Sequence, residues 1–306
     1  MKKVLITGAS GFIGRQCVPV LVSKGYEVHA LSRSRQPETA CPNVSWHQVE
    51  LLRPGSAAEL IDQVRPDSIL HLAWYSEHGK FWEAMENLDW VRASLELLHS
   101  FADSGGKRIV AAGSCAEYNS MAGECIENST PLRPETLYGS SKLALERLFH
   151  SSTPQVGLSS AWGRIFFLYG PNENPSRLVA YVIRSLLRGE RALCSDGKQI
   201  LDFIHVEDAA SAFVALLESD VQGPVNIGSG NPICVRVALE EIGRQLGRME
   251  LIRFGNRASG SKPERFWANI QRLVKEVDWT PHYNLASGIE QTIAWWRNTP
   301  ETSSCD

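Results

Sequence analysis

The sequence predicts an α/β protein built on a doubly wound parallel sheet, with a smaller C-terminal α/β lobe. Three observations carry this prediction. Short apolar runs alternate with amphipathic stretches through the first 170 residues, as strands and helices do around a parallel sheet. The first apolar run ends in a glycine-rich loop that leads into a helical stretch. A chain of 306 residues, 43% hydrophobic and 21% charged, suits one large α/β domain or two lobes.

Strands and helices alternate through most of the first lobe, where the strands at 26–33 and 44–51 follow one another directly. The strands are expected at 2–8, 26–33, 44–51, 67–74, 107–114 and 159–171. The helices are expected at 12–25, 57–66, 86–105 and 140–152. Most of the strand runs are largely apolar, as strands buried on both faces of a parallel sheet are. Pro19 lies inside the first helix and should kink it or shorten one end.

After residue 171 the expected strands and helices no longer alternate regularly. Helices are expected at 176–190, 206–219, 235–247 and 285–297, and strands at 199–206 and 224–230. These more varied elements predict a substrate-binding lobe over 171–297, with some strands returning to the first lobe. We expect it to pack on the carboxyl edge of the sheet, where open α/β sheets bind ligands. The polar tail 298–306 is expected to fray.

Composition excludes several classes of function. The net charge of -3 gives no reason to expect a nucleic acid or an anionic membrane as partner. The first apolar run is too short for a signal-peptide core or a membrane span, and no later stretch is apolar enough to cross a bilayer. The seven cysteines are odd in number and scattered, which argues against a zinc site or a disulfide framework. We therefore expect no metal and a cytoplasmic protein.

The glycine-rich loop, Gly8, Gly11 and Gly14, stands directly between a strand and a helix. The first glycine permits a tight turn, the second lets the backbone approach a pyrophosphate, and the third lets helix and strand pack closely. The helix N-terminus then offers free N–H groups to the phosphates. Residues 1–170 are thus predicted to form a Rossmann-type dinucleotide-binding domain, the alternative being a purely structural turn. The further residues expected to contact the cofactor are Ser10, Phe12, Ile13, Arg15, Glu50, Leu51, Leu72, Ala73 and Trp74.

The end of the second strand predicts which dinucleotide binds. An acidic residue there would bind the ribose 2′-hydroxyl and favour NAD, but this chain has Ser32. Arg33 and Arg35 follow, and Arg15 is expected to point to the same place. Because an arginine fork suits a 2′-phosphate, we expect NADP(H) and regard NAD as the weaker candidate. The alternative is a solvated basic loop.

Three residues are predicted to form a catalytic group. Ser114 ends the fifth strand, and Tyr138 and Lys142 lie four residues apart on one helix face. Serine would hydrogen-bond a substrate carbonyl and tyrosine would exchange the proton. Lysine would lower the pKa of the phenol and hold the nicotinamide ribose. A tyrosine and a lysine at this spacing also occur by chance, so the prediction depends on the surrounding motifs.

Together these motifs resemble the extended short-chain dehydrogenases/reductases, specifically the NAD-dependent epimerase/dehydratase family that acts on nucleotide sugars. The resemblance covers nearly the whole chain. Its segments are "TGASGFIG", "HLAW", Asn87, "GSCAEY", "PLRPETLYGSSK", "GRIFFLYGP", "DGKQILDFIHVED", "VNIGSG" and "DWTPHYNLASGIEQTIAWW". The resemblance implies a bound NAD or NADP, hydride transfer at a sugar carbon, and a nucleoside-diphosphate sugar as substrate. It also implies a homodimer that pairs through two helices of each subunit.

Departures from the family pattern narrow the expected reaction. Cys115 and Ala116 stand where 4,6-dehydratases carry an Asp-Glu pair, so we do not expect dehydration. Fucose-synthase-like reductases that also epimerise have a cysteine at the position of Ala116, so 3,5-epimerisation is not expected. Cys115 is interpreted as a small buried residue, although it borders the expected substrate site beside Ser114.

Other departures affect the expected substrate site. Leu201 replaces an arginine that meets the diphosphate in relatives, and Phe167 replaces a common asparagine. Replacement charge is expected from Arg177, Arg257 and Arg265, and the first and last of these stand where related enzymes use basic residues. Each of the three is alternatively a surface arginine.

The segment 74–82, "WYSEHGKFW", leaves the fourth strand where substrate should lie. Trp74 and Tyr75 are expected to form an apolar wall against a deoxysugar, and His78 and Lys80 to reach hydroxyls or phosphate. The alternative is that these aromatic residues pack against the long helix. His205 is interpreted as a packed strand residue.

The sequence therefore predicts an NADPH-dependent reductase of a 4-keto-6-deoxy nucleotide sugar. Three alternatives remain open: a nucleotide-sugar epimerase with tightly bound NAD, a reductase of a non-sugar ketone, and a dinucleotide-binding regulator without turnover.

Overall fold

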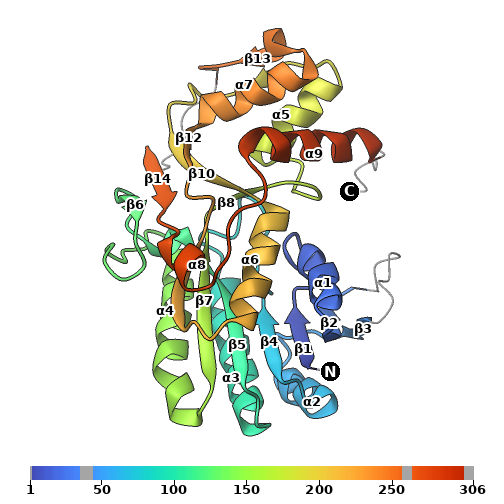
Figure 1. The fold of residues 1–306 in the computed structure, drawn as a ribbon, viewed down its shortest axis with the longest axis vertical. Coiled ribbons are helices and arrows are strands. Elements are labelled where there is room, and N and C mark those ends of the chain that lie inside the picture. The colour runs from blue at the N-terminus through green and yellow to red at the C-terminus, as the bar shows by residue number, and fades with distance from the viewer. Residues whose placement is uncertain (1, 35–43, 257–263, 300–306) are drawn as a thin grey trace.

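The first lobe is organised around a parallel sheet in the computed structural model, which describes residues 2–34, 44–256 and 264–299 (Figure 1). All neighbouring strands of this seven-stranded sheet run parallel. Their order is β11 (Gly223–Ile227), β7 (Ser159–Ile165), β5 (Arg108–Ser114), β4 (Ser68–His71), β1 (Lys3–Thr7), β2 (Glu27–Ser32) and β3 (Val44–Gln48).

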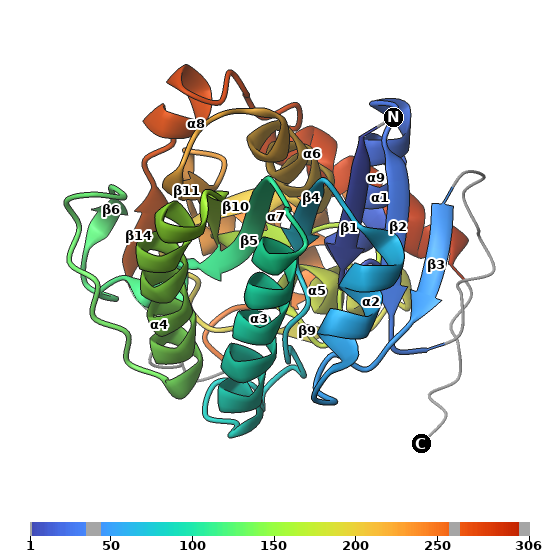
Figure 2. The same ribbon diagram turned by 90° about the horizontal axis from the view of Figure 1, so that it is seen from below.

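Helices cover both faces of this sheet (Figure 2). One face carries α2 (Ser56–Val64), α3 (Glu86–Asp103) and α4 (Leu137–Ser152), and the other carries α1 (Gly14–Ser23) and α6 (Val206–Glu218). The apolar pattern of the strands explains this arrangement. In β1, Val4 and Ile6 pack with residues of α1 and α6, whereas Leu5 packs with residues of α2 and α3. A strand buried on both faces needs this continuous apolar run.

The second lobe lies beyond the carboxyl edge of the sheet (Figure 1). Its five-stranded sheet contains β6 (Gly123–Cys125), β8 (Phe167–Tyr169), β10 (Ile200–His205), β12 (Pro232–Cys234) and β14 (Arg265–Ala268). Its helices are α5 (Leu178–Leu187), α7 (Val235–Leu246) and α9 (Leu285–Asn298), with the short pair β9 (Ala192–Leu193) and β13 (Ile252–Arg253). The remaining short helices are η1 (Cys115–Glu117), η2 (Thr153–Val156), η3 (Met249–Leu251) and α8 (Gln271–Lys275).

The chain crosses between the lobes more often than the sequence indicates. The single strand expected over 159–171 is two strands, because β7 lies between β5 and β11 whereas β8 pairs with β10 of the second lobe. The chain later returns to the first sheet through α6 and β11. Pro19 lies inside α1, which continues to Ser23.

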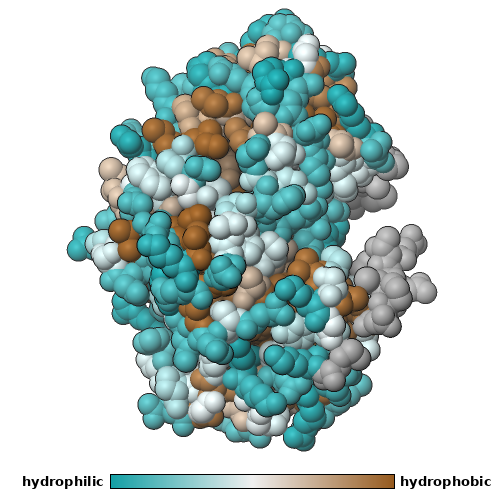
Figure 3. Space-filling view, viewed as in Figure 1, coloured by the Kyte–Doolittle hydropathy of each residue, from teal (hydrophilic) through white to brown (hydrophobic). Residues whose placement is uncertain are grey.

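Hydrophilic residues cover most of the face seen in Figure 3, with hydrophobic patches between them. No helix in the described ranges has the length and apolar character that a membrane span requires. The cysteines of these ranges are all free thiols; they are Cys17, Cys115, Cys125, Cys194 and Cys234.

Candidate active site

The glycine loop packs too tightly for any side chain. Gly8 has a φ of 68°, and a Cβ there would lie 2.8 Å from the Ala73 nitrogen. A Cβ on Gly14 would lie 2.1 Å from the Gly8 carbonyl oxygen, which is well inside van der Waals contact. The helix that follows has no side-chain cap at Ile13 and no acidic residue in its first turn. Its N-terminus therefore suits an anionic group.

The end of β4 is tied to this loop through Thr7. The Thr7 hydroxyl accepts the N–H groups of Leu72 and Ala73, each at 3.1 Å, and lies 2.7 Å from Nδ1 of His71. The other ring nitrogen of His71 lies 2.8 Å from the Ser94 hydroxyl on α3. Burial and the nearby Lys142 charge lower the pKa of His71 to about 3, so this imidazole stays neutral. These hydrogen bonds hold the ends of β1 and β4 together beside the expected cofactor site.

The residues expected to select the dinucleotide lie partly together. Ser32 is buried and its hydroxyl donates to the Ser10 hydroxyl at 3.1 Å. The Arg15 guanidinium donates to the Ser10 carbonyl at 2.8 Å and also to Asn172. Arg15 thus lies beside the Ser10–Ser32 contact and bridges to the loop after β8. Arg33 is exposed. Arg35 falls outside the described residues, as does Arg257.

Of the remaining cofactor candidates, Phe12 and Ile13 are partly buried at the start of α1. Glu50 is exposed just after β3, and Leu51 is buried. The Glu50 carboxylate accepts from the Leu52 N–H at 3.3 Å.

The start of α4 lies in close contact with the turn that follows β5. Thr136 caps α4 by accepting the Gly139 N–H at 3.1 Å. A Cβ on Gly139 would lie 2.4 Å from the Ala116 carbonyl oxygen, so only glycine permits this approach. The approach brings Tyr138 next to Ser114, whose hydroxyl interacts with the phenol and lowers its pKa. Serine and tyrosine therefore meet at the carboxyl edge of the sheet.

Aromatic rings surround the Tyr138 phenol on several sides. The ring centroids of Trp74, Phe81 and Trp82 lie 6.5, 4.9 and 5.7 Å from that of Tyr138, all edge-on. Trp74 also stacks on Trp90 of α3, with centroids 6.2 Å apart. The segment 74–82 therefore packs against both the long helix and the expected catalytic group.

The expected lowering of the Tyr138 pKa by Lys142 was wrong. Burial among the aromatic rings raises the pKa of the phenol above its usual value, and this outweighs the hydrogen bond from Ser114. The Lys142 ammonium faces elsewhere: it donates to the Ala112 carbonyl at 2.8 Å and lies 3.7 Å from the Trp74 ring centroid. Burial lowers the pKa of Lys142 to about 7.

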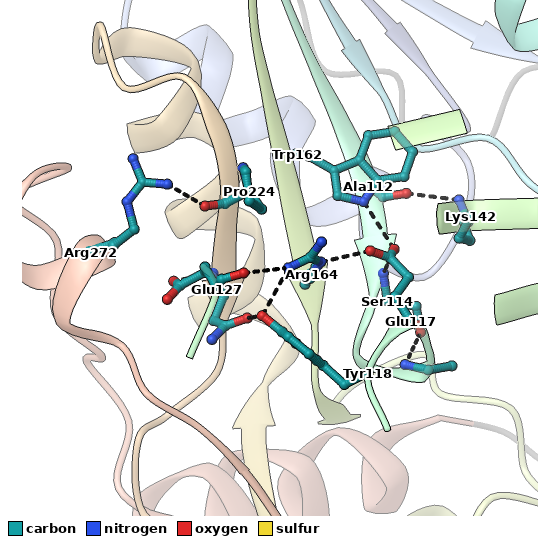
Figure 4. A network of polar contacts seen from close by, with 12 residues as sticks. Ala112, Ser114, Glu117, Tyr118, Glu127, Lys142, Trp162, Arg164, Pro224 and Arg272 are labelled. Carbon is teal, nitrogen blue, oxygen red and sulfur yellow. Dashed lines mark hydrogen bonds and ion pairs between the residues drawn. The ribbon is translucent and has the colours of Figure 1, made fainter. Parts of the chain in front are cut away.

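A buried polar network that sequence analysis missed lies directly beneath Ser114 (Figure 4). Glu117 and Arg164 form an ion pair with 2.7 Å between Oε2 and Nε, and both side chains are almost fully buried. The Arg164 guanidinium also donates to the Tyr118 hydroxyl at 3.0 Å. The only signal in the sequence was a pair of charged residues within two otherwise apolar strand-end motifs, "GSCAEY" and "GRIFFLYGP".

The expected substrate residues divide into two groups. Arg177 lies near the reacting centre, because its charge acts on the Tyr138 phenol, and its Nε is 3.0 Å from Oε1 of the buried Glu173. Cys115 is partly buried, and burial raises its pKa to about 12, so it is a neutral thiol. Phe167 instead packs in the second lobe, where its ring centroid lies 6.4 Å from that of Phe203.

The other group lies on the protein surface. Tyr75 donates to Glu77 at 2.9 Å, and the Lys80 ammonium lies 2.6 Å from the same carboxylate. His78 is exposed in the same turn. Arg265 is exposed on β14, with its guanidinium 5.8 Å from the Trp267 ring centroid.

The residues of this edge fit a nicotinamide dinucleotide. The loop surface is bare backbone at Gly8 and Gly14, where no Cβ fits, and the helix start that follows it is uncapped. A serine, a tyrosine and a lysine then lie at one end of this surface. Those groups match a pyrophosphate at one end and a ribose and carbonyl at the other.

Comparison with known proteins identifies the family of the chain. The model of the NAD dependent epimerase/dehydratase family matches residues 4–228. A dTDP-4-dehydro-6-deoxy-D-allose reductase of Streptomyces bikiniensis is 29% identical over 321 residues, covering 97% of each chain.

Two solved structures are similar over nearly the full length. A UDP-glucose 4-epimerase of Thermotoga maritima with UDP-glucose has a TM-score of 0.86 and 22% identity, covering 96% of this chain and 98% of its own. MoeE5 in complex with UDP-glucuronic acid and NAD has a TM-score of 0.82 and 26% identity, covering 96% and 99%. The chain belongs to the NAD-dependent epimerase/dehydratase family and is an oxidoreductase-type enzyme that depends on a nicotinamide dinucleotide.

Proposed function

We propose that the protein reduces the keto group of a 4-keto-6-deoxy nucleotide sugar with NADPH. The observation that carries this proposal is the pairing of Ser114 with a Tyr138 phenol whose pKa is raised by burial. Such a phenol is protonated at neutral pH, which is the form that a proton donor must have. Reduction of a carbonyl needs a proton donor at the oxygen while hydride reaches the carbon.

Each residue of the catalytic group has a separate task in this proposal. The Ser114 hydroxyl donates a hydrogen bond to the substrate carbonyl oxygen, and Tyr138 donates the proton to that oxygen. The Lys142 ammonium, which donates to the Ala112 carbonyl, can bind ribose hydroxyls. Hydride is the chemistry that a nicotinamide dinucleotide supplies when bound. The aromatic rings of Trp74, Phe81 and Trp82 exclude water from the phenol.

The two residues that follow Ser114 support reduction over dehydration and 3,5-epimerisation. Cys115 is a neutral thiol with a pKa of about 12, and Ala116 has no functional group. Removal of a proton from a sugar carbon needs a base near the operating pH. In the proposed reaction Tyr138 of α4, and no residue of the turn after Ser114, exchanges a proton with the sugar.

A nucleoside-diphosphate sugar is the proposed class of substrate. The similar reductase and the similar solved structures act on or hold dTDP- or UDP-linked sugars. Arg177, whose charge reaches the phenol, is the proposed contact for an anionic part of the substrate. The first lobe would bind the dinucleotide and the second lobe the sugar nucleotide. The free thiols of the described ranges fit a reducing compartment such as the cytoplasm.

The test is a spectroscopic assay of NADPH and NADH oxidation with dTDP-, UDP- and GDP-linked 4-keto-6-deoxy sugars. We expect NADPH to be consumed with at least one of them, with a turnover efficiency at least tenfold above that of NADH. Ser32 offers no carboxylate to a 2′-hydroxyl, whereas the Arg33 guanidinium suits the 2′-phosphate that NADPH carries and NADH lacks. Arg33→Ala should therefore lower the turnover efficiency with NADPH and leave that with NADH nearly unchanged. A tenfold preference for NADH would contradict the cofactor assignment.

An epimerase is the second candidate, and the similarity to the UDP-glucose 4-epimerase favours it. An epimerase oxidises and re-reduces one sugar with a cofactor that stays bound. Protein that purifies with stoichiometric NAD and interconverts two sugar nucleotides without consuming added cofactor would replace the reductase by this function.

We further propose a homodimer that pairs through α3 and α4. These helices lie side by side on one face of the sheet (Figure 2). Each exposes a leucine, Leu88 on α3 and Leu148 on α4, at 48% and 45% of its surface. Analytical ultracentrifugation at micromolar concentration should give twice the mass of the chain, and Leu88→Glu with Leu148→Glu should give the monomer. A monomeric wild type would contradict the pairing.

A further inference from the structure

Glu117 lies beneath the catalytic group without belonging to it (Figure 4). Its side chain is fully buried, and its Oε1 accepts the Ser114 N–H at 2.8 Å. The same oxygen accepts the Trp162 indole N–H at 2.9 Å, and Oε2 accepts the Arg164 Nε–H at 2.7 Å. Three donors, one of them a guanidinium, thus hold both oxygens of the Glu117 side chain in place.

The surrounding backbone is built to hold this carboxylate in place. Ser114 and Glu117 form a capping box around η1, in which the Glu117 side chain accepts the Ser114 N–H and the Ser114 hydroxyl accepts the Ala116 N–H at 3.2 Å. Gly113 leaves room for it, because a Cβ there would lie 2.8 Å from Oε1 of Glu117 and 2.1 Å from the Trp162 indole nitrogen. Neither contact can be relieved by turning a free side chain. The catalytic serine is therefore anchored on Glu117.

Several charged and titratable groups face this carboxylate. From β7 it pairs with Arg164 and accepts the Trp162 indole N–H, and Nζ of Lys142 on α4 lies 5.9 Å from the centroid of the same Trp162 ring. Tyr138 and Glu146 of α4 also interact with its charge. Cys115 lies beside it on η1, and Glu127 lies farther along the network, where it accepts the Asn226 N–H at 2.9 Å. Arg164 and Lys142 are the cations of this set, and Lys142 is the one that belongs to the proposed catalytic group. Its ammonium is bound to the Ala112 carbonyl, two residues before Ser114 on β5.

We propose that Glu117 is a positioning residue of the catalytic group, because its buried side chain anchors the Ser114 backbone and lies, like the Lys142 ammonium, against the Trp162 indole. This inference rests on the proposed function for its role in turnover, but its physical content concerns the protein alone.

The pKa shifts of Lys142 and Tyr138 have the directions that this proposal requires. Burial lowers the pKa of Lys142 to about 7, and the Glu117 charge is the group that raises it. Removing the carboxylate therefore removes the interaction that keeps the ammonium protonated near neutral pH. The same removal lowers the pKa of the Tyr138 phenol, because a negative neighbour disfavours the phenolate. Both titrations move toward lower pH.

The test is a direct titration of Lys142 in protein without cofactor or substrate. Lysine labelled with ¹³C at Cε reports the protonation of Nζ by NMR, and Lys142→Met identifies the signal by its loss. The Glu117→Gln variant keeps the shape of the side chain and removes its charge. We expect the Lys142 midpoint to fall by about one pH unit or more, since a nearby charge changes a pKa by about 1–3 units.

Glu127→Gln is the matched control. It makes the same substitution in another buried acid of the same network, which contacts Asn226 and not the catalytic residues. Its Lys142 midpoint should stay at the wild-type value. A midpoint unchanged in Glu117→Gln, or equally lowered in both variants, would overturn the proposal, because either result makes Glu117 a structural residue only.

A second variant covers the case in which Glu117→Gln does not fold and leaves Arg164 unpaired. The double variant Glu117→Leu with Arg164→Met replaces the whole buried pair by apolar residues, a change that proteins often tolerate. The Lys142 midpoint should fall here as well, and an unchanged midpoint would overturn the proposal. None of these readings needs the substrate, so a failure of the proposed reductase activity would leave the test intact.

Discussion

Replacing Tyr138 by phenylalanine is expected to abolish turnover and leave the fold intact. The substitution removes one oxygen atom from a ring that packs edge-on against Trp74, Phe81 and Trp82. The packing stays, but the only proton donor beside the Ser114 hydroxyl is lost. Since a positioned general acid contributes roughly 10²–10⁴-fold, we expect kcat to fall by about 10³-fold or more.

Steady-state kinetics, circular dichroism and binding of NADPH by fluorescence would measure this effect. Tyr181→Phe is a matched control, because its hydroxyl accepts the Leu193 N–H at 3.0 Å in the second lobe. That variant should lose about 1 kcal/mol of stability and keep its activity. If Tyr138→Phe retained near-normal turnover with an intact fold, the proposed role of the phenol would have to be abandoned.

Replacing Gly14 by alanine is expected to destroy the cofactor site. The added Cβ would lie 2.1 Å from the Gly8 carbonyl oxygen and 2.8 Å from Cα of Ala9. Both neighbours are backbone atoms, so the first turn of α1 must move away from the loop. Overpacking a rigid site costs about 3 kcal/mol or more, and the displaced helix start can no longer meet a pyrophosphate.

Gly25→Ala separates this clash from the ordinary cost of losing a glycine. Gly25 also has a positive φ, 78°, but a Cβ there would have no heavy atom within 4 Å. It should cost only about 1 kcal/mol and leave dinucleotide binding unchanged. Thermal unfolding and titration with NADP would compare the two variants. Equal losses in both would show that the close approach of helix and loop is unimportant.

The structure agrees with the sequence most closely where the physics is local. The glycine loop, the alternation of strands and helices, and the position of Tyr138 on the first turn of α4 depend on backbone geometry and on apolar periodicity within short segments. The segment 159–171 shows the limit of this reasoning. One apolar run became two strands in different sheets, because strand pairing depends on partners such as β10 and β11, which lie far along the chain.

The electrostatics of the site show the same limit more sharply. Spacing placed Lys142 on the same helix face as Tyr138, and the expected consequence was a phenol with a lowered pKa. Burial instead raises the pKa of the phenol, because the rings of segment 74–82 desolvate it. The Lys142 ammonium lies against Ala112 and Trp74. Residues from several elements together determine how strongly the phenol is desolvated. Its pKa therefore cannot be predicted from a local sequence pattern.

The sequence by itself determined the family and the glycine loop between strand and helix, because each depends on residue types at fixed short spacings, while the identity of the catalytic group stays a prediction. Only the tertiary structure decided which charges act on that group. Glu117 and Arg164 lie 47 residues apart and meet beneath Ser114 because β5 and β7 are neighbouring strands. A buried ion pair has no signature along the chain, since its energy depends on the distance and the burial that folding creates.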